Sequence, residues 1–134
     1  MSDFSWKIRV YYEDTDAGGV VYHSQYLNFF ERARTEWLRA RKIDQSSLSE
    51  NEGIVFVVRN MDIEFIKPAK LDNEVLVSVS LKHTGAASLQ LAQTMIRDSD
   101  QQLLAKAEVR VACLTAVEFK PTRIPKNLRK EVLQ

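Results

Sequence analysis

Residues 24–41 have the spacing of a long amphipathic helix and contain neither proline nor glycine. Their apolar residues recur every three or four positions and form a wide stripe: Tyr26, Leu27, Phe29, Phe30, Ala33, Trp37 and Leu38. A helix of this length extends about 25 Å, and its apolar surface is broader than one neighbouring helix would cover. The helix therefore requires a curved sheet to pack against.

The rest of the chain supplies the strands of such a sheet. Apolar and polar residues alternate, as in strands with one buried face, in residues 6–13, 54–66, 75–81, 89–95 and 105–113. In the first of these the even positions are apolar, so Tyr12 is expected to point inward. One strand, one long helix and four strands with short connections favour an α+β fold with antiparallel pairing. Residues 127–134 predict a short final helix.

Length and composition favour a single domain over residues 1–134. A hydrophobic content of 45% suits a core that needs no metal or disulfide. A net charge of +1 gives no strong field to attract nucleic acid or anionic lipid. Cys113 is the only cysteine and lies within an alternating strand, so we expect a small core residue. Without a signal-like or membrane-length apolar run, a cytoplasmic protein with no membrane insertion is expected.

The junction between the first strand and the helix carries the chemistry. The stretch EDTDAGGVVYHSQY holds three acidic residues, adjacent glycines and one of the two histidines. The first turn of a helix has unpaired amide donors, with Ser24 as a candidate cap. A carboxylate beside such donors can act as nucleophile or base while the donors polarise a carbonyl. Asp16 is the candidate carboxylate, and the backbone N–H of His23 or of a neighbouring residue is the candidate donor. The His23 side chain could position water, substrate or the carboxylate.

The same residues have other interpretations. Asp14 and Asp16 could cap the turn by accepting hydrogen bonds from backbone amides. His23 could be a packing or capping residue, and Tyr12 a core residue whose hydroxyl reaches the pocket edge. The acidic residues and His23 could hold a divalent cation, but calcium-loop spacing and HExxH are absent, so no metal and no organic cofactor are predicted. A serine-hydrolase elbow is also absent.

A resemblance to a known family adds to these inferences. YYEDTDAGGVVYHSQYLNFFERARTEWL resembles the amino-terminal signature of bacterial hot-dog-fold acyl-CoA thioesterases associated with the Tol-Pal gene cluster. FVVRNMDIEFIKPAKLDNEVLV, the GAASL turn and AEVRVACL resemble the later strands, so the resemblance covers nearly the whole chain. It implies a hot-dog fold, an antiparallel sheet wrapped around one long central helix. It also implies that Asp16 is catalytic, with the amide of His23 near the thioester carbonyl and supporting roles for the side chains of Tyr12 and His23.

The expected activity is hydrolysis of acyl-CoA, with the acyl group presented on coenzyme A or on acyl carrier protein. The outer strands of an open sheet need cover, which favours edge pairing, and the resemblance implies a homodimer or homotetramer. Lys82 and Arg59 are candidate contacts for the phosphates of coenzyme A, while His83 reads as a solvated turn residue. Two alternatives stay open: a hot-dog dehydratase acting on carrier-bound acyl chains, and a non-catalytic acyl-ligand-binding or envelope-complex scaffold subunit.

Overall fold

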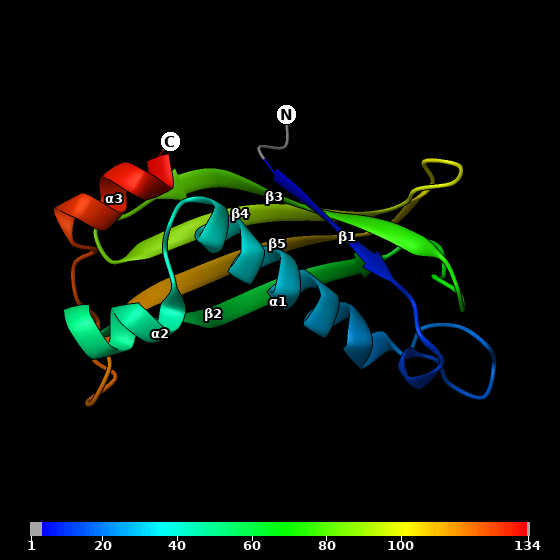
Figure 1. The fold of residues 1–134 in the computed structure, drawn as a ribbon, viewed down its shortest axis with the longest axis horizontal. Helices are drawn as coiled ribbons and strands as arrows, with labels where there is room; N and C mark the ends of the chain where they lie inside the picture. Colours follow the sequence, from blue (N-terminus) through cyan, green and yellow to red (C-terminus); the bar gives the residue numbers. More distant parts are fainter. Residues whose placement is uncertain (1–3, 134) are drawn as a thin grey trace.

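The computed structural model describes residues 4–133. Its strands form one antiparallel sheet in the order β1-β3-β4-β5-β2. Their bounds are β1 (Phe4–Arg9), β2 (Ile54–Phe65), β3 (Glu74–Thr84), β4 (Ser88–Arg97) and β5 (Leu103–Thr115). The long helix α1 (His23–Ala40) crosses the sheet diagonally, with the strands curving behind it (Figure 1). The expected hot-dog arrangement of a sheet around one helix is confirmed.

The apolar stripe of α1 forms the centre of the core. Phe29, Phe30 and Ala33 are fully buried, and Trp37 is 1% exposed. They pack with inward-facing residues of β3 and β4: Val75, Val77, Val79, Leu89, Leu91 and Met95. Leu27, which the stripe was predicted to include, is 43% exposed. It follows Tyr26 directly, so it is rotated about 100° around the helix and lies beyond the edge of the buried face.

The first strand is shorter than its alternation predicts. Ile8 and Val10 are buried as expected, but β1 ends at Arg9, and the chain turns into a short 3₁₀ helix, η1 (Tyr12–Asp14). Tyr12 is 82% exposed, so the prediction that it points inward is wrong. The physical cause is Asp14, whose carboxylate accepts the amide hydrogen of Tyr11 and thereby ends the extended conformation.

The connections add elements that the apolar pattern did not predict. Helical turns α2 (Gln45–Ser47) and η2 (Leu48–Glu52) lead from α1 into β2. Helix α3 (Lys126–Leu133) confirms the predicted terminal helix over the described residues, whereas residue 134 lies outside them. Arg129 of α3 donates to the carbonyl of Gly85 over 2.8 Å and so ties α3 to the β3–β4 turn. No described helix has the length and apolarity needed to cross a membrane.

Strands β1 and β2 are the two edges of the sheet. The register of β2 against β5 shifts between Val58 and Asn60, which marks a β-bulge. Val57 and Val58 on this edge are 38% and 40% exposed, and Phe65 at its end is 51% exposed. These exposed side chains give the β2 edge an apolar surface that the described chain leaves uncovered.

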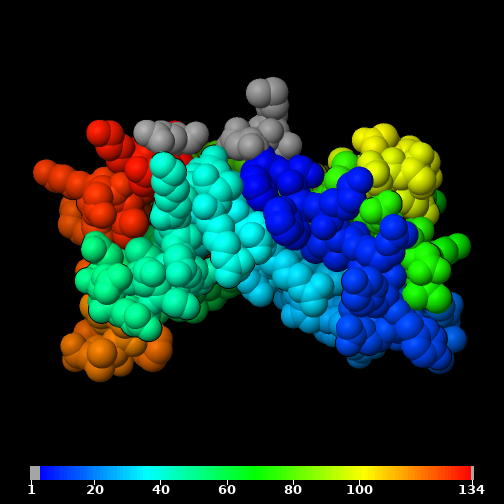
Figure 2. Space-filling view, in the orientation of Figure 1, coloured from blue at the N-terminus to red at the C-terminus, as the bar shows by residue number. Residues whose placement is uncertain are grey.

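The opposite edge strand, β1, lies beside α1. Figure 2 shows α1 and β1 covering one face of the molecule, with a concave outline below α1.

Candidate active site

The loop between η1 and α1 is a tight reversal fixed by backbone hydrogen bonds. The amide of Asp16 donates to the carbonyl of Val20 over 2.9 Å, and the amide of Gly19 donates to the carbonyl of Asp16 over 3.0 Å. Gly19 has φ +80°, a left-handed conformation that costs glycine little. A bridge between Val20 and Lys70 attaches the loop to the segment after β2. This reversal presents Asp16 at its start.

Asp14 is the structural aspartate of this loop. It is 4% exposed, and its carboxylate accepts from the amide of Tyr11 (2.8 Å) and from Nε2 of Gln25 (3.1 Å). Its carbonyl accepts from the amide of Tyr22 over 3.0 Å. Both Tyr22 and Gln25 belong to the start of α1, so Asp14 fixes the loop against the helix. The turn-capping interpretation is correct for this residue.

Asp16 combines a turn contact with a free oxygen. Its Oδ1 accepts from the amide of Gly18 over 2.8 Å, so the capping interpretation holds for one half of the carboxylate. Its Oδ2 has no hydrogen-bond partner within residues 4–133. The side chain is exposed and borders a cleft. A carboxylate oriented through one oxygen while the other stays available can act as a base or nucleophile.

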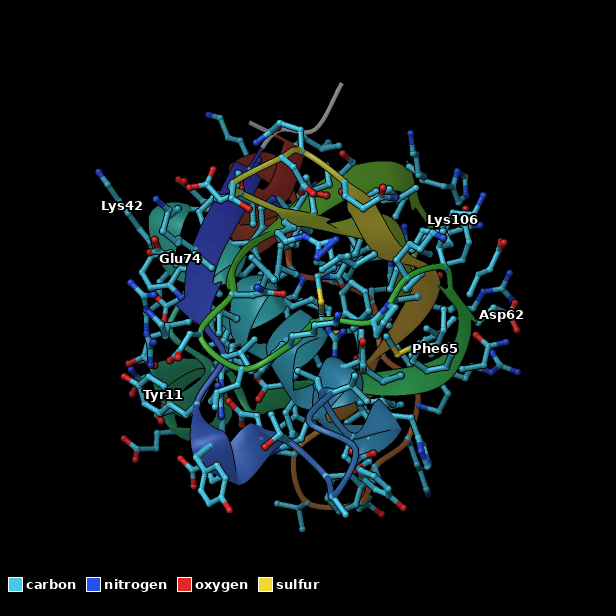
Figure 3. All side chains as sticks on the ribbon, turned by 90° about the vertical axis from the view of Figure 1, so that its right-hand side faces the viewer. Tyr11, Lys42, Asp62, Phe65, Glu74 and Lys106 are labelled. Atoms are coloured by element: carbon cyan, nitrogen blue, oxygen red, sulfur yellow. The ribbon has the colours of Figure 1, made fainter. Side chains whose placement is uncertain are left out.

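The cleft beside Asp16 has a volume of about 370 Å³. It is lined by Asp16, Val20, Val21, His23, Tyr26, Phe65, Ile66, Lys67 and Pro68. The loop, the first turn of α1 and the end of β2 thus meet around one space. Figure 3 looks onto this end of the molecule and labels Phe65, whose ring meets Tyr26 edge-on at 5.1 Å between centroids. Tyr26 in turn accepts the amide hydrogen of Ala69 over 3.0 Å, which fixes the cleft wall.

The start of α1 borders the same cleft, because His23 is one of its lining residues. The helix begins at His23, and its cap residue Tyr22 makes no side-chain capping bond. Ser24 is therefore the second helical residue, and the prediction that it caps the helix is wrong. Within the described chain the amides of His23 and Ser24 have no acceptor. The first turn also carries no acidic residue of its own, so carboxylates near this positive end of the helix dipole come from the preceding loop.

The other candidate residues lie in different surroundings. The His23 ring is exposed and packs at 4.3 Å from the ring of Tyr22. Tyr12 is not among the residues that line this cleft. Lys82 and Arg59 are exposed on β3 and β2. His83 is exposed as expected, but it lies within β3 opposite Gln90 of β4, so the prediction that it belongs to a turn is wrong. Sequence reasoning missed Lys67, which is the only lysine or arginine among the residues that line the cleft. Its one signal was the strand-ending Lys67-Pro68 pair.

The fold and this cleft define a class, the hot-dog thioesterases. Residues 10–132 match the family model of the thioesterase-like superfamily, and the chain belongs to this family. It is 44% identical to the acyl-CoA thioesterase YbgC of Haemophilus influenzae, over 94% of this chain and 91% of that one. It is 43% identical to the acyl-CoA thioester hydrolase YbgC of Escherichia coli, over 98% and 96% of the two chains. The protein is accordingly an enzyme of the thioester hydrolase class.

Solved structures support the same fold. A probable thioesterase from Bartonella henselae is 37% identical, with a TM-score of 0.85 over 90% of this chain and 98% of that one. A 1,4-dihydroxy-2-naphthoyl-CoA thioesterase from Synechocystis has a TM-score of 0.90 over 98% and 96% of the two chains. Its identity is 24%, so it supports the fold alone.

Proposed function

We propose that this protein hydrolyses acyl-CoA thioesters to the free acid and coenzyme A in the cleft between Asp16 and the start of α1. One observation carries the proposal: a carboxylate with an uncommitted oxygen and a helix start with uncommitted amides border the same space. The YbgC relatives, which match nearly the whole chain, carry acyl-CoA hydrolase names. Together these favour coenzyme A as the carrier of the thioester.

In the general-base route, Asp16 removes a proton from water as the water oxygen attacks the thioester carbonyl carbon. The carbonyl oxygen becomes negatively charged, and the N–H of His23 stabilises it. When the C–S bond breaks, the thiolate of coenzyme A receives the proton from Asp16. Losing such an oxyanion donor typically costs about 3–4 kcal/mol of transition-state stabilisation.

In the nucleophilic route, an oxygen of Asp16 attacks the same carbon and the thiolate leaves, which forms a mixed anhydride. Water then cleaves the anhydride and restores the carboxylate. Both routes use the same two groups, and hydrolysis in isotopically labelled water distinguishes them. Label that enters the Asp16 side chain in a single turnover indicates an anhydride that water cleaves at the Asp16 carbon, whereas label found only in the product acid excludes that cleavage.

His23 and Tyr12 are proposed as supporting residues. The His23 side chain borders the cleft, where an imidazole can orient water or the carboxylate. Tyr12 is exposed outside the cleft of its own protomer, so its proposed role requires that a partner subunit bring it to a site. That requirement makes Tyr12 the weaker assignment of the two.

We further propose a homodimer formed through the β2 edge, which can pair into a homotetramer. Exposed Val57 and Val58 on an unpaired edge strand support this assembly, because such an edge is stabilised by pairing. The cytoplasmic location, acyl carrier protein as an alternative donor, and the link to Tol-Pal stay predictions from the sequence.

The proposal is tested by thiol release from a panel of purified acyl-CoAs that spans short, long and aromatic acyl groups. Turnover of at least one member by the wild-type protein, and loss of that turnover in Asp16→Asn, are expected. Tight binding of acyl-CoA without thiol release from any member would instead favour the non-catalytic scaffold.

A further inference from the structure

A second cavity lies under the other half of α1. It has a volume of about 100 Å³, room for several water molecules or a short hydrocarbon chain. Its apolar walls come from α1, β2, β4 and β5 and include Leu38, Phe56, Leu89, Leu91 and Val111. Arg34 of α1 also lines it, and we call it the Arg34 cavity. It shares no lining residue with the Asp16 cleft.

The guanidinium of Arg34 is held in place by a buried amide. Its Nη1 donates to Oε1 of Gln93 over 2.9 Å, and Gln93 on β4 is 1% exposed. Nε2 of Gln93 donates to the carbonyls of Phe30 (3.1 Å) and Ser78 (3.3 Å). These two bonds fix which end of the amide is the oxygen, because a carbonyl accepts only from the NH₂ group. Gln93 therefore connects α1 to β3 and directs its oxygen at Arg34.

Arg34 has no acidic partner at ion-pair distance within residues 4–133. Gln93, its one hydrogen-bond partner there, is neutral. Burial lowers the pKa of Arg34, and the more distant charge of Glu31 partly opposes this. Glu31 itself is exposed at the cavity and accepts the hydroxyl hydrogen of Thr35. A partly desolvated cation thus borders an apolar cavity with most of its donors uncommitted.

We propose that the Arg34 cavity binds a short apolar carboxylate. The hydrocarbon chain occupies the apolar walls, and the carboxylate accepts hydrogen bonds from the Arg34 guanidinium, whose planar fork suits a carboxylate. This goes beyond the proposed function, because it uses none of the Asp16 cleft. The ligand with this chemistry is a free carboxylic acid, such as hydrolysis releases.

Trp37 lines the cavity and reports on binding. In a Trp6→Phe background it is the only indole, so its N–H resonance in an NMR spectrum is unambiguous. Titration with hexanoate should shift this resonance saturably, whereas hexanol should bind at least about tenfold more weakly because it lacks the charge. No saturable shift with hexanoate, or equal affinity for hexanol, overturns the proposal.

Two variants test whether hexanoate binding depends on Arg34 itself or only on the positive charge of the helix. Arg34→Met should weaken hexanoate binding by about tenfold or more, whereas Arg39→Met, an exposed arginine of the same helix, should not change it. Equal binding by Arg34→Met and wild type contradicts the proposal. If Arg34→Met does not fold, hexanoate binding by Glu31→Gln tests the proposal instead. Removing the nearby negative charge should tighten binding by about threefold, and unchanged or weaker binding overturns the proposal.

Hydrolysis tests whether the cavity is separate from the Asp16 cleft. Because the ligand is a free acid, Arg34→Met should hydrolyse adipoyl-CoA and hexanoyl-CoA at the wild-type ratio. A kcat/KM lowered for adipoyl-CoA alone would contradict the proposal. Absence of hydrolysis of either substrate by the wild type would count against the proposed function, while hexanoate binding would still decide the cavity.

Discussion

Asp14 and Asp16 are separated by one residue in the same loop, yet the carboxylate of Asp14 is buried and that of Asp16 is exposed. Asp14 is 4% exposed and accepts from Tyr11 and Gln25. Asp16 is exposed, its carboxylate accepts only from the amide of Gly18, and it borders the cleft. One aspartate thus stabilises the junction, and the other is available for chemistry.

These different roles predict that substituting Asp14 lowers stability much more than substituting Asp16. Asp14→Ala should lower the free energy of unfolding by about 1–3 kcal/mol, because it removes a buried carboxylate and leaves the amide of Tyr11 and the side chain of Gln25 without their acceptor. Asp16→Ala should change it by no more than about 0.5 kcal/mol, as expected for an exposed residue. Chemical denaturation followed by circular dichroism measures both values. A comparable loss in both variants would contradict the assignment of roles.

The adjacent glycines predict separable effects on activity and stability. A Cβ at Gly18 would lie 3.2 Å from Oδ1 of Asp16, so Gly18→Ala should displace the carboxylate and lower kcat/KM by about tenfold. At Gly19 the added Cβ has open space but φ is +80°, so Gly19→Ala should cost about 1 kcal/mol of stability. Thermal unfolding and thiol release on both variants test this. The reverse pattern would mean that the loop does not orient Asp16.

The β2 edge predicts an assembly that charge can disrupt. Val57→Lys places a charge on the exposed apolar edge and should shift the protein toward the monomer in light scattering after size exclusion. Val117→Lys is the matched control, because Val117 is 89% exposed outside the strands and should leave the oligomeric state unchanged. A wild-type protein that is monomeric, or a Val57→Lys oligomer as stable as wild type, argues against pairing through β2.

The burial of Cys113 predicts that its thiol is protected from chemical reagents in the folded protein. It is fully buried, and burial raises the pKa of its thiol, so the reactive thiolate is scarce at neutral pH. The native protein should react with a thiol reagent such as dithionitrobenzoate far more slowly than the protein in denaturant, which should react completely. Rapid reaction of the native protein would show that the core opens at β5.

The sequence predicted most of the fold because the periods of its apolar residues differ by element. A period of about 3.6 residues located α1 from Tyr26 to Trp37, and alternation located the β3–β4 hairpin around Gly85. The order of the strands was not readable, because it depends on contacts between distant segments. Leu27 was placed in the buried stripe of α1 but is exposed, because the apolar character of a residue does not by itself show whether it lies inside or outside the edge of the buried helix face.

The site was predicted in part, for a different reason. Asp16 and His23 are near in sequence, so a local motif could bring them together, and the structure lines one cleft with both. The predicted orientation of Tyr12 was wrong because the alternation was extended past Arg9, where the strand ends and the Asp14 carboxylate accepts the amide hydrogen of Tyr11. Lys67 and Phe65 enter the cleft only through the tertiary fold, so no pattern near Asp16 could have indicated them.

The most direct test of the account is thiol release by Asp16→Asn, measured on the acyl-CoA that the wild type hydrolyses best. Asparagine keeps the size of the side chain and the oxygen that accepts from Gly18, but it cannot serve as base or carboxylate nucleophile. We expect Asp16→Asn to lower kcat by about a hundredfold or more and to leave the melting temperature unchanged. Wild-type kcat in the folded Asp16→Asn protein would contradict it.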